Sequence, residues 1–144
     1  MARLVGVNHV ALEVGDLDEA LEFYGAVFEL ELRGRIGDEM AFLDMGDQFL
    51  ALSVGRRQAP DEERHVGLVV DDKEATRRAL DAAGADVLPT RGLDFRDPWG
   101  NHLQSSSTPI SSSQRRAEAL RGMGLEGLDK SEVARRELRE KGLE

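Results

Sequence analysis

The sequence predicts an α+β fold in which two tandem β-α-β-β-β modules are followed by C-terminal helices. The main observation is a repeat: HVALEVGD, from His9 to Asp16, returns as HVGLVVDD, from His65 to Asp72. In both copies apolar residues alternate with small or polar ones, as in a strand with one buried face. A helical pattern that begins at an acidic residue follows each strand. We therefore expect a duplicated unit with one histidine opening each copy.

The first module is predicted to cover residues 4–55. Its first strand is followed by a helix that Asp16 caps, with Glu19 three residues later completing a capping pair. Tyr24 falls on the helical stripe that would cover the sheet, so we interpret it as a core residue. The strands of this module are predicted over 7–14, 28–32, 39–45 and 48–54, and a Gly46-Asp47 turn joins the last two.

The second module is predicted to cover residues 64–106. Asp71 and Glu74 repeat the capping pair, and Gly84 is the expected stop of the helix. Its strands are predicted over 66–70, 87–88, 92–95 and 102–105, and a turn over 97–101 precedes the last. Both modules belong to one predicted domain, 1–107, with a polar linker at 56–63. A Ser-rich stretch and two helices, over 114–121 and 129–141, form a predicted tail, 108–144.

The composition narrows the class of protein. Of the 144 residues 40% are hydrophobic and 33% are charged, which is typical of soluble globular proteins. The sequence contains no run of about 20 apolar residues, so we expect no membrane span. A net charge of −9 disfavours nucleic acid as a partner. Because there are no cysteines, thiolate metal sites and cysteine nucleophiles are excluded. The N-terminus has no signal-peptide pattern, and we expect a cytoplasmic protein.

Taken together, the motifs resemble those of the vicinal oxygen chelate superfamily, which includes glyoxalase I, extradiol dioxygenases, and fosfomycin- and bleomycin-resistance proteins. The resemblance covers residues 4–106. The matching stretches are NHVALEV around His9, the first helix with its Phe23-Tyr24 pair, HVGLVV from His65, and DPWGNHLQ from Asp97 to Gln104. The last of these is similar to the family signature Asp-Pro-x-Gly-Asn-x-x-Glu.

The resemblance implies a curved mixed sheet around a central cavity that holds a divalent metal. Carried over, the ligands are His9, His65 and Gln104. Such a set suits Fe(II), Mn(II), Ni(II), Co(II) or Zn(II) and leaves positions open for a bidentate substrate. Gln104 stands where the family has glutamate, and a neutral amide is a weaker ligand that cannot act as a base. The fourth ligand position of glyoxalase I falls on Leu50 or Ala51, both apolar, which disfavours that activity.

Two further residues are candidates for substrate binding. Glu13 shares a strand face with His9 but lies about 13 Å away, too far to bind the same ion, so we place it at the cavity mouth. His102 shares a face with Gln104. Three interpretations of His102 stay open: a replacement ligand, an acid or base, or a solvated surface residue.

The sequence leads to one main functional hypothesis and two alternatives. The main one is a metal-dependent enzyme of the glyoxalase/dioxygenase type, a homodimer acting on a small oxygen-bearing substrate chelated to the metal. Lyase, isomerase and dioxygenase chemistry all stay open. The first alternative is a metal-free protein that sequesters a small molecule, as the bleomycin-resistance proteins do. The second is a scaffold dimer whose tail helices form the interface.

Overall fold

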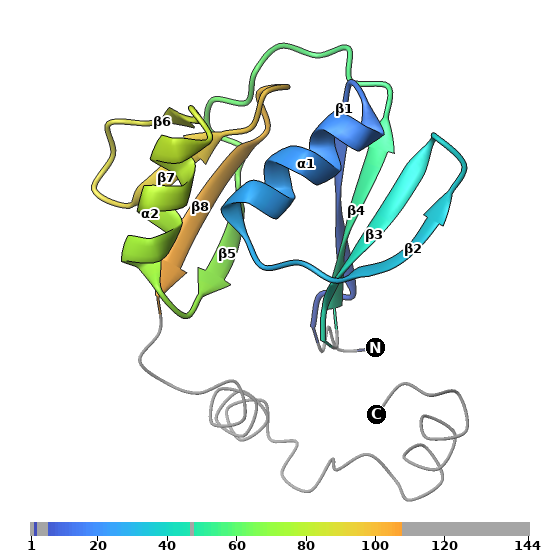
Figure 1. The fold of residues 1–144 in the computed structure, drawn as a ribbon, viewed down its shortest axis with the longest axis horizontal. Coiled ribbons are helices and arrows are strands. Elements are labelled where there is room, and N and C mark those ends of the chain that lie inside the picture. Colours follow the sequence, from blue (N-terminus) through green and yellow to red (C-terminus); the bar gives the residue numbers. More distant parts are fainter. Residues whose placement is uncertain (1, 3–5, 47, 108–144) are drawn as a thin grey trace, which may run out of the picture. The chain divides into compact units, whose positions relative to one another are not determined.

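The computed structural model describes residue 2 and residues 6–46 and 48–107. These residues form two successive β-α-β-β-β modules, as predicted (Figure 1). The first module consists of β1 (His9–Val14), α1 (Leu17–Val27), β2 (Leu32–Ile36), β3 (Met40–Met45) and β4 (Gln48–Val54). The second consists of β5 (Val66–Val70), α2 (Lys73–Ala82), β6 (Asp86–Val87), β7 (Leu93–Arg96) and β8 (His102–Ser107). The tail helices predicted over 114–121 and 129–141 lie outside the described residues.

Each module forms its own four-stranded mixed sheet. The strand order is β1-β4-β3-β2 in the first sheet and β5-β8-β7-β6 in the second, and the described strands close no barrel. In each sheet the first strand pairs in parallel with the last, while the other neighbours are antiparallel. The ladders pair Ala11 with Ala51 and Gly67 with Gln104, so the two modules share one register. Below, the two are called sheet A and sheet B.

Helix α1 follows the predicted pattern, but the strand after it does not. Asp16 is the N-cap and accepts a 2.9 Å hydrogen bond from the Glu19 amide. The strand predicted over 28–32 is wrong, because the Phe28 amide still bonds the Tyr24 carbonyl as the helix C-cap. Strand β2 begins only at Leu32.

Helix α2 is capped one residue later than predicted. The side chain of Asp72, not that of Asp71, accepts the hydrogen bond from the Ala75 amide at 2.9 Å. Asp71 instead accepts from the Asp72 amide at 2.8 Å. Gly84, with a φ of +65°, follows the helix end as predicted, since this backbone conformation favours glycine.

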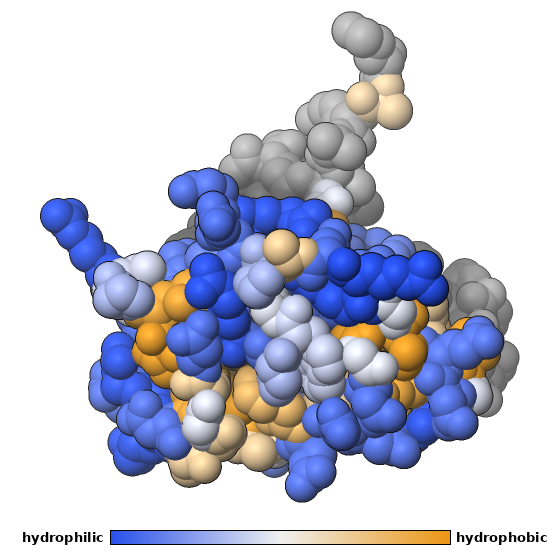
Figure 2. Space-filling model, turned by 90° about the horizontal axis from the view of Figure 1, so that it is seen from above, coloured by the Kyte–Doolittle hydropathy of each residue, from blue (hydrophilic) through white to orange (hydrophobic). Residues whose placement is uncertain are grey.

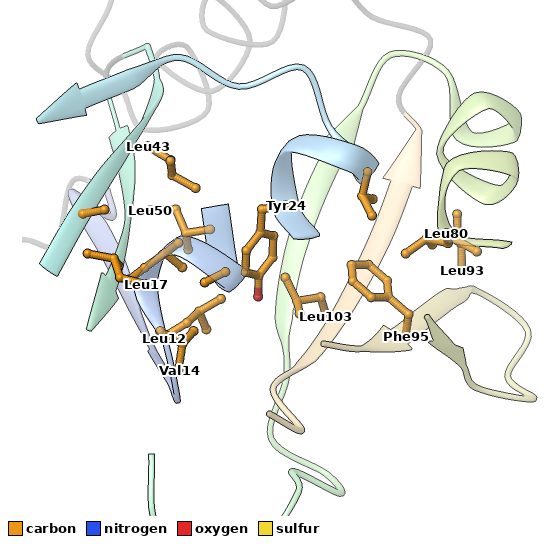
Figure 3. Packing of buried hydrophobic residues seen from close by; sticks show 14 residues of the cluster. Leu12, Val14, Leu17, Tyr24, Leu43, Leu50, Leu80, Leu93, Phe95 and Leu103 are labelled. Carbon is orange, nitrogen blue, oxygen red and sulfur yellow. The ribbon is translucent and has the colours of Figure 1, made fainter. Parts of the chain in front are cut away.

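The buried apolar residues of both modules form one core. Figure 1 shows α1 lying between the two sheets, and Figure 3 shows Tyr24 of α1 between the leucines of sheet A and Leu103 of sheet B. Tyr24 is fully buried, so its interpretation as a core residue is confirmed. Trp99, in the turn before β8, packs so closely on the turn after β1 that a Cβ at Gly15 would lie 2.5 Å from its Nε1.

Most of the visible surface on the side of the connection between the modules is hydrophilic, with separate apolar patches (Figure 2). The large exposed apolar residues come from several elements: Val7, Leu32, Ile36, Met45, Val54 and Val69. Neither described helix is long and apolar enough to cross a membrane.

Candidate functional site

One face of sheet B gathers most of the predicted polar site residues. The ladder between β7 and β8 pairs Asp94 with Gln104, and that between β5 and β8 pairs Gly67 with Gln104. His65 precedes β5, and its ring centroid lies 5.2 Å from that of His102. The sheet therefore brings His102 and Gln104 to the carboxylate of Asp94, with His65 beside His102.

Asp94 is the hydrogen-bonding centre of this face. It is 3% exposed, and its Oδ1 lies 3.0 Å from His102 Nε2 and 3.1 Å from Gln104 Nε2. Thr90 donates its hydroxyl proton to Oδ2. Burial by itself raises the pKa of Asp94, but the hydrogen bonds from Thr90, His102 and Gln104 outweigh it and hold this pKa below its ordinary value. The group is therefore a carboxylate near neutral pH.

His102 is buried rather than solvated. It is 8% exposed, so its interpretation as a surface residue is wrong. Its Nδ1 lies 3.1 Å from the carbonyl oxygen of Glu62, and its Nε2 lies 3.0 Å from Asp94. Both ring nitrogens are thus engaged within the protein. A metal ion or substrate would have to displace one of these contacts to reach His102.

His9 lies on sheet A in different surroundings. It is exposed, and its ring stacks on Phe49 with centroids 4.7 Å apart and planes inclined by 9°. Its Nδ1 lies 2.8 Å from Oδ1 of Asn8. If the ring donates through Nδ1, Nε2 is left as an acceptor that can bind a metal. The guanidinium of Arg33 lies 5.6 Å from the Phe49 ring centroid and adds positive charge nearby.

A cavity of about 450 Å³ lies between β1, which lines it from Val10 to Glu13, and the start of β5. Glu13 lines it and accepts a 3.0 Å hydrogen bond from Gln58 Nε2. His65 and Arg64 line the opposite side. Asn101 joins the two sides, because its Nδ2 donates to the Glu13 carbonyl at 2.8 Å.

The connection between the modules contributes a buried ion pair to this cavity. Arg56, whose side chain is 4% exposed, lies 3.2 Å from Asp61 and also bonds Asn101. Arg64 pairs with the same carboxylate from the surface. Burial favours the neutral acid, but hydrogen bonds from Arg64 and Arg56 lower the pKa of Asp61 below its ordinary value. The predicted linker thus forms one wall of the cavity.

Within one chain, His9 opens β1 and His65 immediately precedes β5, so each histidine lies at the start of its strand. Figure 1 shows β1 and β5 running in opposite directions. The cavity wall includes Glu13 and His65 but not His9, which is about 13 Å from Glu13 along the strand. In the part of the chain that the structure describes, no three His, Asp or Glu side chains converge as a metal centre.

The ladders also decide which residue of the first module corresponds to Gln104. Ala51 pairs with Ala11, two residues after His9, just as Gln104 pairs with Gly67, two residues after His65. Ala51 rather than Leu50 therefore occupies the fourth position. The side chain of Ala51 is a methyl group, which has no atom that can bind a metal ion.

Asp94 was not among the residues predicted from the sequence. The available signal was an acidic residue inside an apolar strand, between Leu93 and Phe95. A carboxylate in such a position needs hydrogen-bond donors, because its burial without them would cost several kcal/mol. The alternation of β7 places it on the same sheet face as the residues of β8 that supply them.

Comparison with known proteins identifies relatives. The family model of the Glyoxalase/Bleomycin resistance protein/Dioxygenase superfamily matches residues 6–104. A metallothiol transferase, FosB, from Shouchella clausii is 30% identical over 114 residues, which cover 69% of this chain and 77% of that protein.

Solved structures share the fold. The fosfomycin resistance protein FosX from Listeria monocytogenes superposes with a TM-score of 0.66 at 18% identity, covering 79% of this chain and 99% of that one. A variant of FosX complexed with Mn(II) and 1S,2S-dihydroxypropylphosphonic acid gives a TM-score of 0.64 at 17% identity, with 81% and 98% covered.

Proposed function

Because the chain belongs to the Glyoxalase/Bleomycin resistance protein/Dioxygenase superfamily, we propose that it is a metal-dependent enzyme acting on a small oxygen-bearing substrate. The observation that carries this proposal is the face of sheet B, where Gln104 contacts Asp94 and His65 lies beside His102 at the wall of a cavity of about 450 Å³. A cavity of this size suits a small molecule, and the residues around it are polar enough to orient one.

The donor atoms fit a divalent transition metal. We propose His9, His65 and Gln104 as its ligands, that is, two imidazole nitrogens and one amide oxygen. Such a set binds Fe(II), Mn(II), Ni(II), Co(II) or Zn(II), more weakly than one that includes a carboxylate. When bound, the metal would polarise oxygen atoms of the substrate as a Lewis acid.

The separation of the two histidines supports a site shared between two copies of the chain. His9 is exposed on sheet A, at the end of β1 remote from His65. We propose a homodimer in which His9 of one copy meets His65 and Gln104 of the other. Two-fold symmetry would then give two equivalent sites.

The relatives suggest which substrates to try first. FosB is named as a metallothiol transferase, and FosX as a fosfomycin resistance protein. We propose fosfomycin together with a small thiol as the first substrate pair. Arg56 and Arg64 on the cavity wall share the single carboxylate of Asp61, which leaves positive charge for a phosphonate, and Glu13 offers a hydrogen-bond acceptor on the opposite side.

One observation favours the second candidate, a metal-free protein that sequesters a small molecule in the same cavity. Gln104 is neutral, and its amide already bonds Asp94. A site without a carboxylate ligand retains a metal less strongly, whereas binding by shape and hydrogen bonds does not require one.

Metal content separates the two candidates. Untagged protein purified without chelator is analysed for bound transition metals before and after addition of Mn(II), Fe(II), Ni(II), Co(II) and Zn(II). We expect a stoichiometric ion that His9→Ala and His65→Ala lose and that Gln58→Ala, a cavity control outside the predicted ligand set, retains. If the wild-type protein binds none of these ions, the metal-dependent function is excluded. Metal-free sequestration of a small molecule is then the remaining candidate. Turnover of fosfomycin with a thiol then tests the substrate.

A further inference from the structure

Asp94 makes a contact with Gln104 that determines which way the amide points. Oδ1 of Asp94 lies 3.1 Å from Nε2 of Gln104, and the same oxygen lies 3.0 Å from Nε2 of His102. Thr90 bonds the other oxygen. The side chain of Asp94 is therefore held on two sides, and it cannot turn without losing several hydrogen bonds.

The backbone of the neighbouring loop leaves room for this arrangement. A Cβ at Gly92 would lie 2.5 Å from Oδ2 of Asp94 and 3.4 Å from Nε2 of Gln104. The first distance is shorter than nonbonded carbon–oxygen contacts allow, so a side chain here would push the carboxylate away. The lack of a side chain at Gly92 thus allows Asp94 to reach Gln104.

The chemistry of the two groups fixes the orientation of the amide. An ionised carboxylate can only accept hydrogen bonds, so the NH₂ group of Gln104 must face it. Since the two ends of a planar amide diverge, Oε1 of Gln104 is turned away from Asp94.

We propose that Asp94 is a positioning residue that fixes Gln104 so that its oxygen, and not its NH₂ group, is presented as a metal ligand. This inference rests on the proposed metal-dependent function. It also explains how a neutral amide can serve in that position. A freely rotating amide would present its NH₂ group, which cannot bind a cation, in part of its orientations, whereas a fixed one presents only oxygen.

A double-mutant cycle tests the proposal, with the affinity for Mn(II) measured by titration calorimetry. In the wild-type background we expect Asp94→Asn to weaken Mn(II) binding about tenfold or more, because outer partners of metal ligands contribute on that scale. In the Gln104→Glu background both terminal atoms of residue 104 are oxygens, so no orientation has to be fixed. There we expect Asp94→Asn to weaken Mn(II) binding by a clearly smaller factor, because only the loss of a nearby negative charge remains. The size of the effect therefore depends on residue 104.

A role of Asp94 in folding, or through its charge alone, predicts no such difference. If Asp94→Asn weakens Mn(II) binding by the same factor in both backgrounds, or changes it in neither, the inference is wrong although the metal-dependent function stands. If none of the four proteins binds Mn(II), both are wrong. Thermal unfolding of each protein checks that it is folded. If Asp94→Asn is not folded, Asp94→Ser, which also removes the carboxylate, replaces it with the same expected difference between backgrounds.

Thr90→Val is the matched control. It removes a hydrogen bond to Asp94 but leaves the contact between Asp94 and Gln104 in place. We expect it to lower the melting temperature slightly and to change Mn(II) affinity by a similar factor in both backgrounds. A larger effect in the wild-type background than in the Gln104→Glu background would contradict the assignment to the contact with Gln104.

Discussion

The hydroxyl group of Tyr24 donates a 2.8 Å hydrogen bond to Oδ2 of Asp97, and this buried contact joins α1 of the first module to the turn before β8 in the second. Asp97 also accepts hydrogen bonds from the backbone amides of Trp99 and Asn101. Burial, followed by the negative charge of Asp97, raises the pKa of Tyr24 well above its ordinary value. The phenol is therefore a permanent donor that fixes one module against the other.

Tyr24→Phe removes this hydrogen bond while keeping the ring in the core. We expect the free energy of unfolding to fall by about 1–3 kcal/mol, because hydrogen bonds to charged groups contribute on this scale. Urea unfolding measures the change. In a cycle with Asp97→Asn, the two substitutions should be non-additive. Additive effects would mean that the contact does not couple the modules.

The ion pair of Asp61 with Arg56 predicts a dependence of stability on pH. The pKa of Asp61 is lower in the folded than in the unfolded protein, so its contribution is fully present above the unfolded value, about 3.9, and is lost as pH falls through the folded value. At pH 7 we expect Asp61→Asn to destabilise the fold by about 2 kcal/mol. The difference from wild type should shrink as the pH falls below about 4.

An exposed acidic residue provides the control for this prediction. Asp38 pairs with Arg35, but its side chain is 96% exposed. Exposed pairs contribute little to stability, so Asp38→Asn should leave the unfolding curve nearly unchanged from pH 3 to pH 7. If Asp61→Asn behaves in the same way in urea unfolding across this range, the buried pair does not stabilise the protein.

The repeat made much of the fold predictable. The alternating strands from His9 and His65 and the cap at Asp16 are local patterns, and each appears in the structure as expected. The cap of α2 was missed by one residue because Asp71 and Asp72 are adjacent and local sequence does not choose between them.

The arrangement of the site was less predictable, because it depends on contacts between distant segments. That His102 is buried follows from its contacts with Glu62 and Asp94, which come from the connection and from β7. Likewise, the opposite placement of His9 and His65 results from how the two modules pack against each other, and no local sequence pattern predicts that packing. Strand patterns identify which side chains share a sheet face, but not which faces meet.

Trp99 predicts a steric effect at the turn after β1. A Cβ at Gly15 would lie 2.5 Å from Nε1 and 2.8 Å from Cδ1 of the indole ring. Gly15→Ala should therefore displace Trp99 and lower the free energy of unfolding by about 1–3 kcal/mol. Because Trp99 is the single tryptophan, its fluorescence spectrum reports the displacement directly.

Gly25→Ala serves as the opposite case. A Cβ at Gly25, within α1, meets nothing within 4 Å, and alanine favours a helix over glycine. We expect this variant to be more stable than wild type by about 0.5–1 kcal/mol, with unchanged fluorescence. Equal destabilisation by both substitutions would contradict the close packing of Trp99 on Gly15.

The proposed shared site predicts complementation between two inactive variants. His9→Ala and His65→Ala should each bind no metal, since every site in either homodimer lacks one histidine. After the two are mixed and allowed to exchange subunits, each mixed dimer has one site with both histidines and one with neither. About half of the dimers are then mixed, so about a quarter of the wild-type Mn(II) stoichiometry should return. If each chain instead builds its own site, no amount of exchange restores binding, and size-exclusion chromatography of the mixture confirms that dimers were present.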